Sequence, residues 1–415
     1  MTNNNVLYLH TAISKNKKME TLFEKHHQKI AYTSLRFTRS LMDNIHWDAR
    51  LIGIRGARGV GKTTLLLQYI KKNLPQDSTV LYVSLDDIWF SEHKLVELAD
   101  TFSKRGGLYL FLDEVHKYPD WSQELKNIYD DHPQLKIVFT GSSLLGLLNA
   151  RADLSRRAIV YDMQGLSFRE YLGIVTGVSL PVYTLINILE NHTKISQVVL
   201  SQLKPLQHFD AYLRKGYYPF FLEVPELYYI RIEEVINMIL DVELPLLRGM
   251  DISYVPKLKQ LLLIIAESVP FIPNVSKLSE RIGINRTTFM AYLYYLQEAH
   301  ITKHLYRSIT GIARLQKPDK IFLENTNLQY AFASDNADTG NIRETFFFNQ
   351  VSYKHKVELP QEGDFVVDGK YLFEVGGKGK GFSQIAGYDS RYVVADNLEY
   401  GAGDKIPLWQ FGFLS

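Results

Sequence analysis

Runs of apolar residues alternate with helical patterns over the first 170 or so residues. Five runs predict β-strands: LIGIRG at 51–56, TVLYVSLDD at 79–87, GLYLFLDEVH at 107–116, LKIVFTGSS at 135–143 and AIVYDM at 158–163. Continuous apolar strands separated by helices are typical of a parallel sheet that is covered on both faces. A segment over 15–48, with Leu35, Leu41 and Ile45 near one face, is predicted to be mostly helical and to precede this α/β sheet.

The strand signals stop after LSFREYL at 166–172. Residues 181–250 have helical patterns that are broken by prolines, and 254–310 predict a helix, a turn, a helix and two strands. From about 320 the chain is again rich in β patterns: KIFLEN, GDFVVDGKYLFEV, RYVVADN and IPLWQFGF. We therefore expect three domains, at 1–175, 176–315 and 316–415.

Composition narrows the classes of function. The 415 residues include 46% hydrophobic and 22% charged residues, as in folded globular proteins. Cysteine is absent, which excludes disulfides, cysteine-ligated metals and thiol nucleophiles. The net charge is only +2, so nucleic-acid binding would need a local basic patch. No apolar run is long enough to span a bilayer and the first residues do not resemble a secretory signal, so we expect a cytoplasmic protein without a membrane partner.

The strongest chemical signal is a phosphate-binding loop. The segment GARGVGKT fits the pattern G-x-x-x-x-G-K-[ST], with a predicted strand before it and a predicted helix after it. Glycines let backbone N–H groups surround phosphate oxygens, Lys62 can reach the β- and γ-phosphates, and the Thr63 hydroxyl can bind Mg²⁺. The alternative is a glycine-rich turn without a ligand. The predicted nucleotide-binding residues are Gly56, Ala57, Arg58, Gly59, Val60, Gly61, Lys62, Thr63 and Thr64.

An acidic pair ends the apolar run LYLFLDEVH. Asp113 is predicted to support Mg²⁺, and Glu114 to orient or deprotonate the attacking water. A pair that only caps the following helix is the alternative. A glutamate directly after the aspartate favours hydrolysis over simple binding.

Polar residues after the next strand are candidates for contact with the γ-phosphate. Ser142 is the first choice and Thr140 the second, and a simple helix cap is the alternative for the same serine. Arg151, Arg156 and Arg157 follow, and an arginine near the γ-phosphate would stabilise charge in the transition state, from the same or a neighbouring subunit. Surface ion pairs are the alternative for these arginines.

Together, GARGVGKTTLL, LFLDEVHKYPDW, FTGSSLLGLL, LSRRA and LSFREYL resemble AAA-type P-loop ATPases of bacteria and archaea that carry an uncharacterised C-terminal domain. RKGYYPFFL and KPDKIFLENTNLQYAF extend the resemblance. It implies an ATPase joined to a helical and winged-helix region and a restriction-endonuclease-like end. It also implies that Arg157 is the family's arginine after the sensor strand. His116 departs from the glutamine of many relatives.

The segment VSKLSERIGINRTTFMAYLYYLQEAHITKHLYR at 275–307 predicts a winged helix. Gly283 fits the turn, Asn285 the helix cap, and Arg286, Thr287 and Thr288 the positions that touch DNA bases in such motifs. A lid or a protein-docking module is the alternative, because few basic residues accompany them. Tyr292, Tyr294 and Tyr295 are expected on an apolar helix face.

Three carboxylates near the C-terminus resemble the metal site of restriction-like nucleases: Glu344, Asp364 and Glu374. Gly376 stands where such nucleases place a lysine, with Lys378 and Lys380 as possible substitutes in the loop GGKGKG. We expect an inactive interaction domain, with a weak metal-dependent nuclease as the alternative.

The first hypothesis is therefore an Mg²⁺-dependent ATPase in which hydrolysis rearranges C-terminal domains that bind double-stranded DNA or a protein. The second is a nucleotide-gated binding module with little turnover. ATP is favoured over GTP because the base-reading signature N-K-x-D is not evident. An arginine supplied in trans would require at least a dimer, so the sequence leaves the oligomeric state open.

Overall fold

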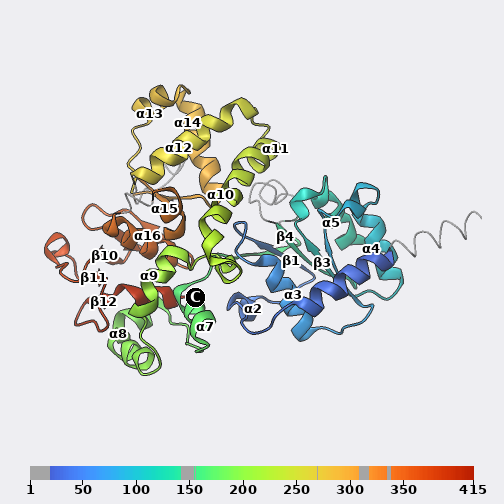
Figure 1. The fold of residues 1–415 in the computed structure, drawn as a ribbon, viewed down its shortest axis with the longest axis horizontal. Coiled ribbons are helices and arrows are strands. Elements are labelled where there is room, and N and C mark those ends of the chain that lie inside the picture. The colour runs from blue at the N-terminus through green and yellow to red at the C-terminus, as the bar shows by residue number, and fades with distance from the viewer. Residues whose placement is uncertain (1–18, 142–153, 155, 269, 308–316, 334–337) are drawn as a thin grey trace, which may run out of the picture. The chain divides into compact units, whose positions relative to one another are not determined.

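The computed structural model describes residues 19–141, 154, 156–268, 270–307, 317–333 and 338–415 (Figure 1). The chain divides into two compact units, Met1–Met163 and Gln164–Ser415. The finer division into three domains with boundaries near 175 and 315 stays a prediction.

The first unit is built on a five-stranded sheet. Its strands are β1 (Leu51–Arg55), β2 (Val80–Ser84), β3 (Tyr109–Asp113), β4 (Lys136–Gly141) and β5 (Ile159–Asp162). They lie in the order β2-β3-β4-β1-β5, and all neighbouring pairs are parallel. The predicted strands and the parallel α/β fold are confirmed. Because parallel strands end at one edge, the loop after β1 and the acidic pair after β3 share that edge, with the end of β4 between them.

Helices cover this sheet on both faces (Figure 1). They are a helix over 19–32, α2 (Leu41–Asn44), α3 (Lys62–Asn73), α4 (Leu95–Lys104) and α5 (Trp121–Asp131), with short 3-10 helices η1 (Ile88–Ser91) and η2 (Val115–Lys117). The helix of 19–32 borders the edge strand β2, where the imidazole Nδ1 of His26 accepts a hydrogen bond from the Tyr82 backbone N–H at 3.0 Å. Burial and the neighbouring His27 lower the pKa of His26 to about 4, so the ring is neutral and can accept this bond.

The prediction of a mostly helical 15–48 is only partly right. Between the helix of 19–32 and α2 the chain has no regular structure, and Leu35 is 42% exposed. The carbonyl groups of this stretch bond to a side chain of α3, which takes the place of hydrogen bonds within a helix. Gln68 on α3 donates hydrogen bonds to the carbonyls of Ser34 and Phe37 at 2.8 and 2.7 Å, which holds this stretch against α3 instead of in helical turns.

The second unit begins with a series of helices. They are α7 (Phe168–Thr176), α8 (Leu185–Leu200), α9 (Leu206–Lys215), α10 (Tyr228–Met238), α11 (Leu244–Arg248) and α12 (Val255–Glu267), with 3-10 helices at Pro219–Leu222, Pro225–Leu227 and Ile252–Tyr254 and a π-helix at Ile239–Glu243. Pro219 and Pro225 each start a 3-10 helix, as prolines do where a regular helix cannot continue. None of the helices in the described ranges combines the length and the apolar character needed to cross a membrane.

A helix-turn-helix follows α12. It consists of α13 (Val275–Ile282) and α14 (Arg286–Glu298), and an antiparallel pair, β6 (Thr302–Leu305) and β7 (Lys320–Leu323), comes next. Gly283 has a φ of 70° in the turn, and the Asn285 side chain caps α14 through the Thr288 backbone N–H at 2.8 Å. An isolated bridge joins Phe271 to Ile321. This element order is the one that the predicted winged helix requires, and the winged-helix assignment stays a prediction.

The last part of the chain is a small α/β region. Helices α15 (Thr326–Phe332) and α16 (Thr339–Val351) precede the strands β8 (Val357–Glu358), β9 (Phe365–Val367), β10 (Tyr371–Gly376), β11 (Arg391–Ala395) and β12 (Lys405–Pro407). The sheet order is β12-β11-β10-β9-β8, with parallel pairs on one side of β10 and antiparallel pairs on the other. Its likeness to restriction endonucleases stays a prediction.

The predicted strand IPLWQFGF is mostly wrong. Only its first residues lie in β12, and Leu408–Phe413 form a 3-10 helix, η10. All six residues of η10 are buried. A strand at the edge of a sheet buries alternate side chains on one face, whereas this segment is enclosed by α7, α8 and α16, so a compact helical turn fits the site better.

A buried polar network ties α9 to α15. The Asn327 side chain donates to the carbonyls of Tyr212 and Leu213 at 3.1 and 2.7 Å, and it accepts from the Tyr217 backbone N–H at 2.8 Å and from the Tyr228 hydroxyl. Asn327 is fully buried. One amide thus satisfies backbone groups at the start of the segment RKGYYPFFL (214–222), which is why the chain can leave the helix there and still be buried.

Candidate functional site

The loop between β1 and α3 has the backbone of a phosphate-binding loop. Gly59 and Gly61 have positive φ angles of 85° and 97°, which favour glycine. A Cβ at Gly56 would lie 2.0 Å from the Met163 carbonyl oxygen, so this position also requires glycine. The loop leads directly into α3, whose amino end is a favourable place for an anion.

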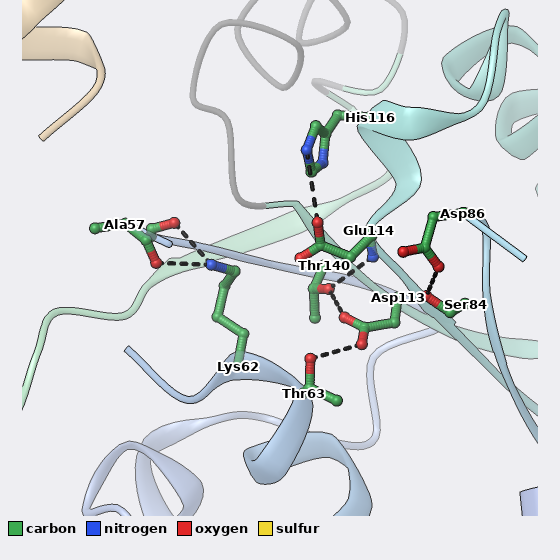
Figure 2. A network of polar contacts seen from close by, with 10 residues as sticks. Ala57, Lys62, Thr63, Ser84, Asp86, Asp113, Glu114, His116 and Thr140 are labelled. Carbon is green, nitrogen blue, oxygen red and sulfur yellow. Dashed lines mark hydrogen bonds and ion pairs between the residues drawn. The ribbon is translucent and has the colours of Figure 1, made fainter. Parts of the chain in front are cut away.

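Lys62, the first residue of α3, extends back over the loop. Its amine donates hydrogen bonds to the carbonyl oxygens of Gly56 and Ala57 at 2.8 and 2.9 Å (Figure 2). The side chain is buried. The cation is therefore already at the loop where a polyphosphate would lie. Arg58 is partly buried nearby and Thr64 is exposed on α3, and their nucleotide contacts stay predictions.

Asp113 lies at the centre of a set of hydroxyl donors (Figure 2). Its Oδ2 accepts hydrogen bonds from Thr63 Oγ1 and from the Tyr82 hydroxyl, each at 2.7 Å. Its Oδ1 accepts from the hydroxyl of Thr140, which comes from β4. The carboxylate is only 2% exposed. The donors compensate for its loss of water and fix its orientation.

These oxygens fit a magnesium ion. A threonine hydroxyl and an aspartate carboxylate are hard ligands of the type that Mg²⁺ prefers, and Mg²⁺ at such sites takes further ligands from phosphates and water. Within the described ranges, no three acidic or histidine side chains stand close enough to hold a metal by themselves. A magnesium ion here would accordingly depend on the nucleotide.

Glu114 is held by its backbone and lies beside His116. Its φ of 55° is in the left-handed region, which costs a non-glycine residue about 1 kcal/mol and often marks an active site. The Glu114 N–H donates to Thr140 Oγ1 at 3.2 Å, so Thr140 contacts both acidic residues. Glu114 Oε2 lies 3.7 Å from His116 Nε2. Burial, and then the charges of Lys117, Lys62 and Arg58, lower the pKa of His116 to about 3, so this imidazole is neutral at pH 7.

Several residues at the site were not predicted from the sequence. Tyr82 reaches Asp113 from β2. Arg39, which is buried, donates to the Val60 carbonyl in the phosphate loop at 2.8 Å. Asp86 accepts from Ser84 Oγ at 2.5 Å at the end of β2 (Figure 2). In the sequence, the strand β2 ends in polar residues, as the acidic strand β3 does, and this is the one feature that could have indicated Tyr82 and Asp86.

The residues predicted to sense the γ-phosphate have different outcomes. Ser142 and Arg151 lie outside the described residues. Thr140, the second choice, is at the site. Arg157 forms a two-bond ion pair with Asp130 at 3.0 and 2.9 Å. Asp130 lies in the last turn of α5 and Arg157 precedes β5, so both are near the amino ends of the strands, opposite the phosphate loop. The structure does not bring Arg157 to the loop of its own chain, and its catalytic role stays a prediction.

The predicted DNA-facing residues lie at the start of α14. Arg286 and Thr287 are exposed, Thr288 is half-buried, and Arg281 on α13 is exposed as well. Lys303 on β6 pairs with Glu324 at 3.4 Å and donates to Ser352 at 2.8 Å, so its charge is used within the fold. Tyr292 is buried, as expected for an apolar face, but Tyr294 is half exposed. The positive face of this element is therefore small.

A second group of charged side chains gathers on the small α/β region. Burial, followed by the charges of Asp364 and Glu374, raises the pKa of Glu344 to about 7. Glu374 is only 1% exposed and forms an ion pair with Lys380. A Cβ at Gly376 would lie 2.9 Å from the Lys380 side chain. The glycine at the expected lysine position thus leaves the space that Lys380 fills. Lys320 lies 3.9 Å from Glu344.

Comparison with known families agrees with this geometry. Residues 48–172 match the model of a family described as AAA domain, and residues 206–339 match a domain of unknown function (DUF8612). The expected likeness to AAA-type P-loop ATPases with an uncharacterised C-terminal domain is confirmed. Residues 48–172 thus match the AAA domain model and have the parallel sheet and phosphate loop of a P-loop NTPase fold, and helical and small α/β regions follow.

The individual proteins that resemble this chain have low sequence identity to it. The uncharacterized protein MJ1637 of Methanocaldococcus jannaschii is 29% identical over 286 residues, which cover 65% of this chain and 60% of that protein. The Walker-type ATPase PABY2304 of Pyrococcus abyssi shares 13% identity at a TM-score of 0.41, over 71% of this chain and 95% of its own. AMPPCP-bound DnaA from Aquifex aeolicus shares 15% identity at a TM-score of 0.26, over 64% of this chain and 93% of its own. With similarities this low, the assignment rests on the family model and on the loop geometry.

Proposed function

We propose that the protein is an Mg²⁺-dependent ATPase. The observation that supports this most directly is that Lys62, Thr63 and Asp113 meet at one edge of the sheet, with Glu114 beside them. These groups combine a phosphate-binding cation, a pair of magnesium ligands and a base for water. A purely structural loop would need neither the magnesium ligands nor the base.

Each side chain has a defined task in this proposal. The backbone N–H groups of 56–61 and the Lys62 amine bind the β- and γ-phosphates. Thr63 and Asp113 hold the magnesium ion, which neutralises charge on the phosphates. Glu114 orients the attacking water and accepts its proton. Through its hydroxyl, Thr140 donates to the Asp113 carboxylate and accepts from the backbone N–H of Glu114. Ser142 is proposed to contact the γ-phosphate, and so is Arg157, supplied by a neighbouring subunit.

We further propose that hydrolysis rearranges the helical and C-terminal regions and so controls their binding to double-stranded DNA. The exposed Arg281, Arg286 and Thr287 at the helix-turn-helix support DNA as the partner. A protein partner is the alternative, because the basic surface is small.

The proposal is tested by ATP turnover and binding. Wild type is expected to release phosphate only with Mg²⁺. Replacement of Lys62 by alanine removes a cation from the phosphates and should weaken binding of a fluorescent ATP analogue by about 10- to 100-fold, because hydrogen bonds to charged groups contribute about 1.5–3 kcal/mol. Lys72→Ala, at an exposed position on the same helix, is the matched control and should bind as wild type does.

Two results would change this conclusion. If wild type binds ATP but releases no phosphate with or without duplex DNA, the protein is a nucleotide-gated binding module. If wild type does not bind ATP at all, the loop is structural. Stimulation of turnover by duplex DNA, lost at high salt, would identify DNA as the partner.

A weak nuclease is a second candidate function, and one observation favours it. Lys380 pairs with Glu374 next to Glu344 and Asp364, so the lysine that is missing from the sequence pattern is replaced in space. With Mg²⁺ or Mn²⁺ and without ATP, we expect slow nicking of supercoiled plasmid that falls about 100-fold or more in Asp364→Ala and Glu374→Ala. Asp389→Ala changes an exposed carboxylate of the same region and serves as the control. Equal nicking by wild type and all variants would show that a contaminating nuclease cuts the plasmid. The small α/β region would then be an inactive interaction domain.

A further inference from the structure

Tyr82 occupies an unusual place for a tyrosine of an edge strand. Its ring is 2% exposed, and its hydroxyl lies 2.7 Å from Asp113 Oδ2. Thr63 donates to the same oxygen at the same distance. Of the three hydroxyls on Asp113, only that of Tyr82 comes from outside the phosphate loop and the central strand β4.

The chemistry of a phenol suits a fixed donor. A phenol is protonated at neutral pH, so the Tyr82 hydroxyl can donate its hydrogen bond to the carboxylate of Asp113. Asp113 is buried, and each donor lowers the free energy of its charged form. Loss of one donor would leave the carboxylate freer to rotate away from Thr63.

The helix of 19–32 holds Tyr82 from the other side. Lys29 Nζ lies 3.4 Å from the Tyr82 hydroxyl and 4.9 Å from the ring centre. His26 accepts the hydrogen bond of the Tyr82 backbone N–H at 3.0 Å. A cation above the ring and a backbone anchor together restrict the rotamer of the tyrosine. This segment lies outside the AAA family match, which begins at residue 48.

We propose that Tyr82 is a positioning residue of the ATP site, which holds Asp113 in the orientation that receives magnesium, with Lys29 as its support. The inference rests on the proposed ATPase function. It assigns to the helix before the AAA domain a direct influence on the nucleotide site.

The test compares nucleotide affinity with and without magnesium. In Tyr82→Phe, the gain in affinity for a fluorescent ATP analogue on adding Mg²⁺ should fall about three- to tenfold, because Asp113 loses one donor while Thr63 and Thr140 still hold it. Affinity in EDTA should stay within about twofold of wild type, because the phosphate loop is unchanged. Lys29→Met should also reduce the increase in affinity that Mg²⁺ produces (the magnesium gain), but by less than Tyr82→Phe does.

Tyr118→Phe is the matched control. Its hydroxyl is hydrogen-bonded to the Leu95 backbone and to Glu124 in the same unit, away from Asp113, so its magnesium gain should equal that of wild type. If Tyr82→Phe keeps the wild-type gain, or if it loses affinity equally in EDTA, the proposal is overturned. Failure of wild type itself to bind ATP would instead refute the proposed function, so the two failures are distinguishable.

Discussion

Replacement of Glu114 by glutamine is expected to lower Mg²⁺-dependent ATP turnover by about 100- to 1,000-fold while ATP binding stays within about threefold of wild type. Glutamine has nearly the shape of glutamate but cannot accept a proton from water. The left-handed backbone and the bond from the Glu114 N–H to Thr140 belong to the main chain and should persist in the variant. The loss would therefore come from chemistry and not from a displaced loop.

Phosphate release and the affinity for a fluorescent ATP analogue are the two measurements. Glu97→Gln, on the exposed side of α4, is the control for removal of a carboxylate and should turn over ATP as wild type does. Wild-type turnover in Glu114→Gln would show that another group accepts the proton. His116 is a poor substitute, because its neutral ring with a pKa of about 3 is a very weak base.

The second large effect is expected on stability. Asn327→Leu keeps the branched shape of the side chain but removes five hydrogen bonds from a fully buried position. At about 1 kcal/mol for each bond, the variant should lose about 3–5 kcal/mol of unfolding free energy. The Tyr217 N–H and the Tyr228 hydroxyl would remain buried without an acceptor.

Hydrogen exchange at increasing urea can measure this loss in the affected region. The urea midpoint at which peptides spanning α9 and α15 lose protection should fall clearly in Asn327→Leu. It should fall at least as far in Asn327→Asp, because a buried carboxylate would face the carbonyl oxygens of Tyr212 and Leu213. Asn237→Leu, at an exposed position on α10, should leave the midpoint nearly unchanged. If Asn327→Leu behaved like Asn237→Leu, the network would contribute nothing to stability.

The sequence predicts which residues meet at the candidate nucleotide site because most of them lie in two short segments. The residues of the phosphate loop are contiguous, and the acidic pair directly follows an apolar strand. Backbone conformation at Gly59 and Gly61 is a property of that short segment. The order of strands then brings Lys62, Thr63 and Asp113 together without any further information, since parallel strands end at one edge.

Other members of the site depend on pairings across long stretches of chain. Tyr82 and Arg39 contact the site only because β2 lies beside β3 and because residues 33–39 lie along α3. Lys380 is four residues beyond the expected position, and only the turn closed by its N–H and the Gly377 carbonyl returns it to Glu374. Spacing rules assume a regular strand, so they do not foresee a residue that is restored by a loop.

The contact between His26 and the Tyr82 N–H also bears on solubility. Edge strands with unpaired N–H groups can pair with other chains and aggregate. In this protein a side chain of the helix over 19–32 occupies that position on β2. A fragment begun at residue 48, where the family match starts, would present an open strand edge and invite self-association. The helix over 19–32 is therefore expected to reduce aggregation through β2, and any fragment of the first unit should include it.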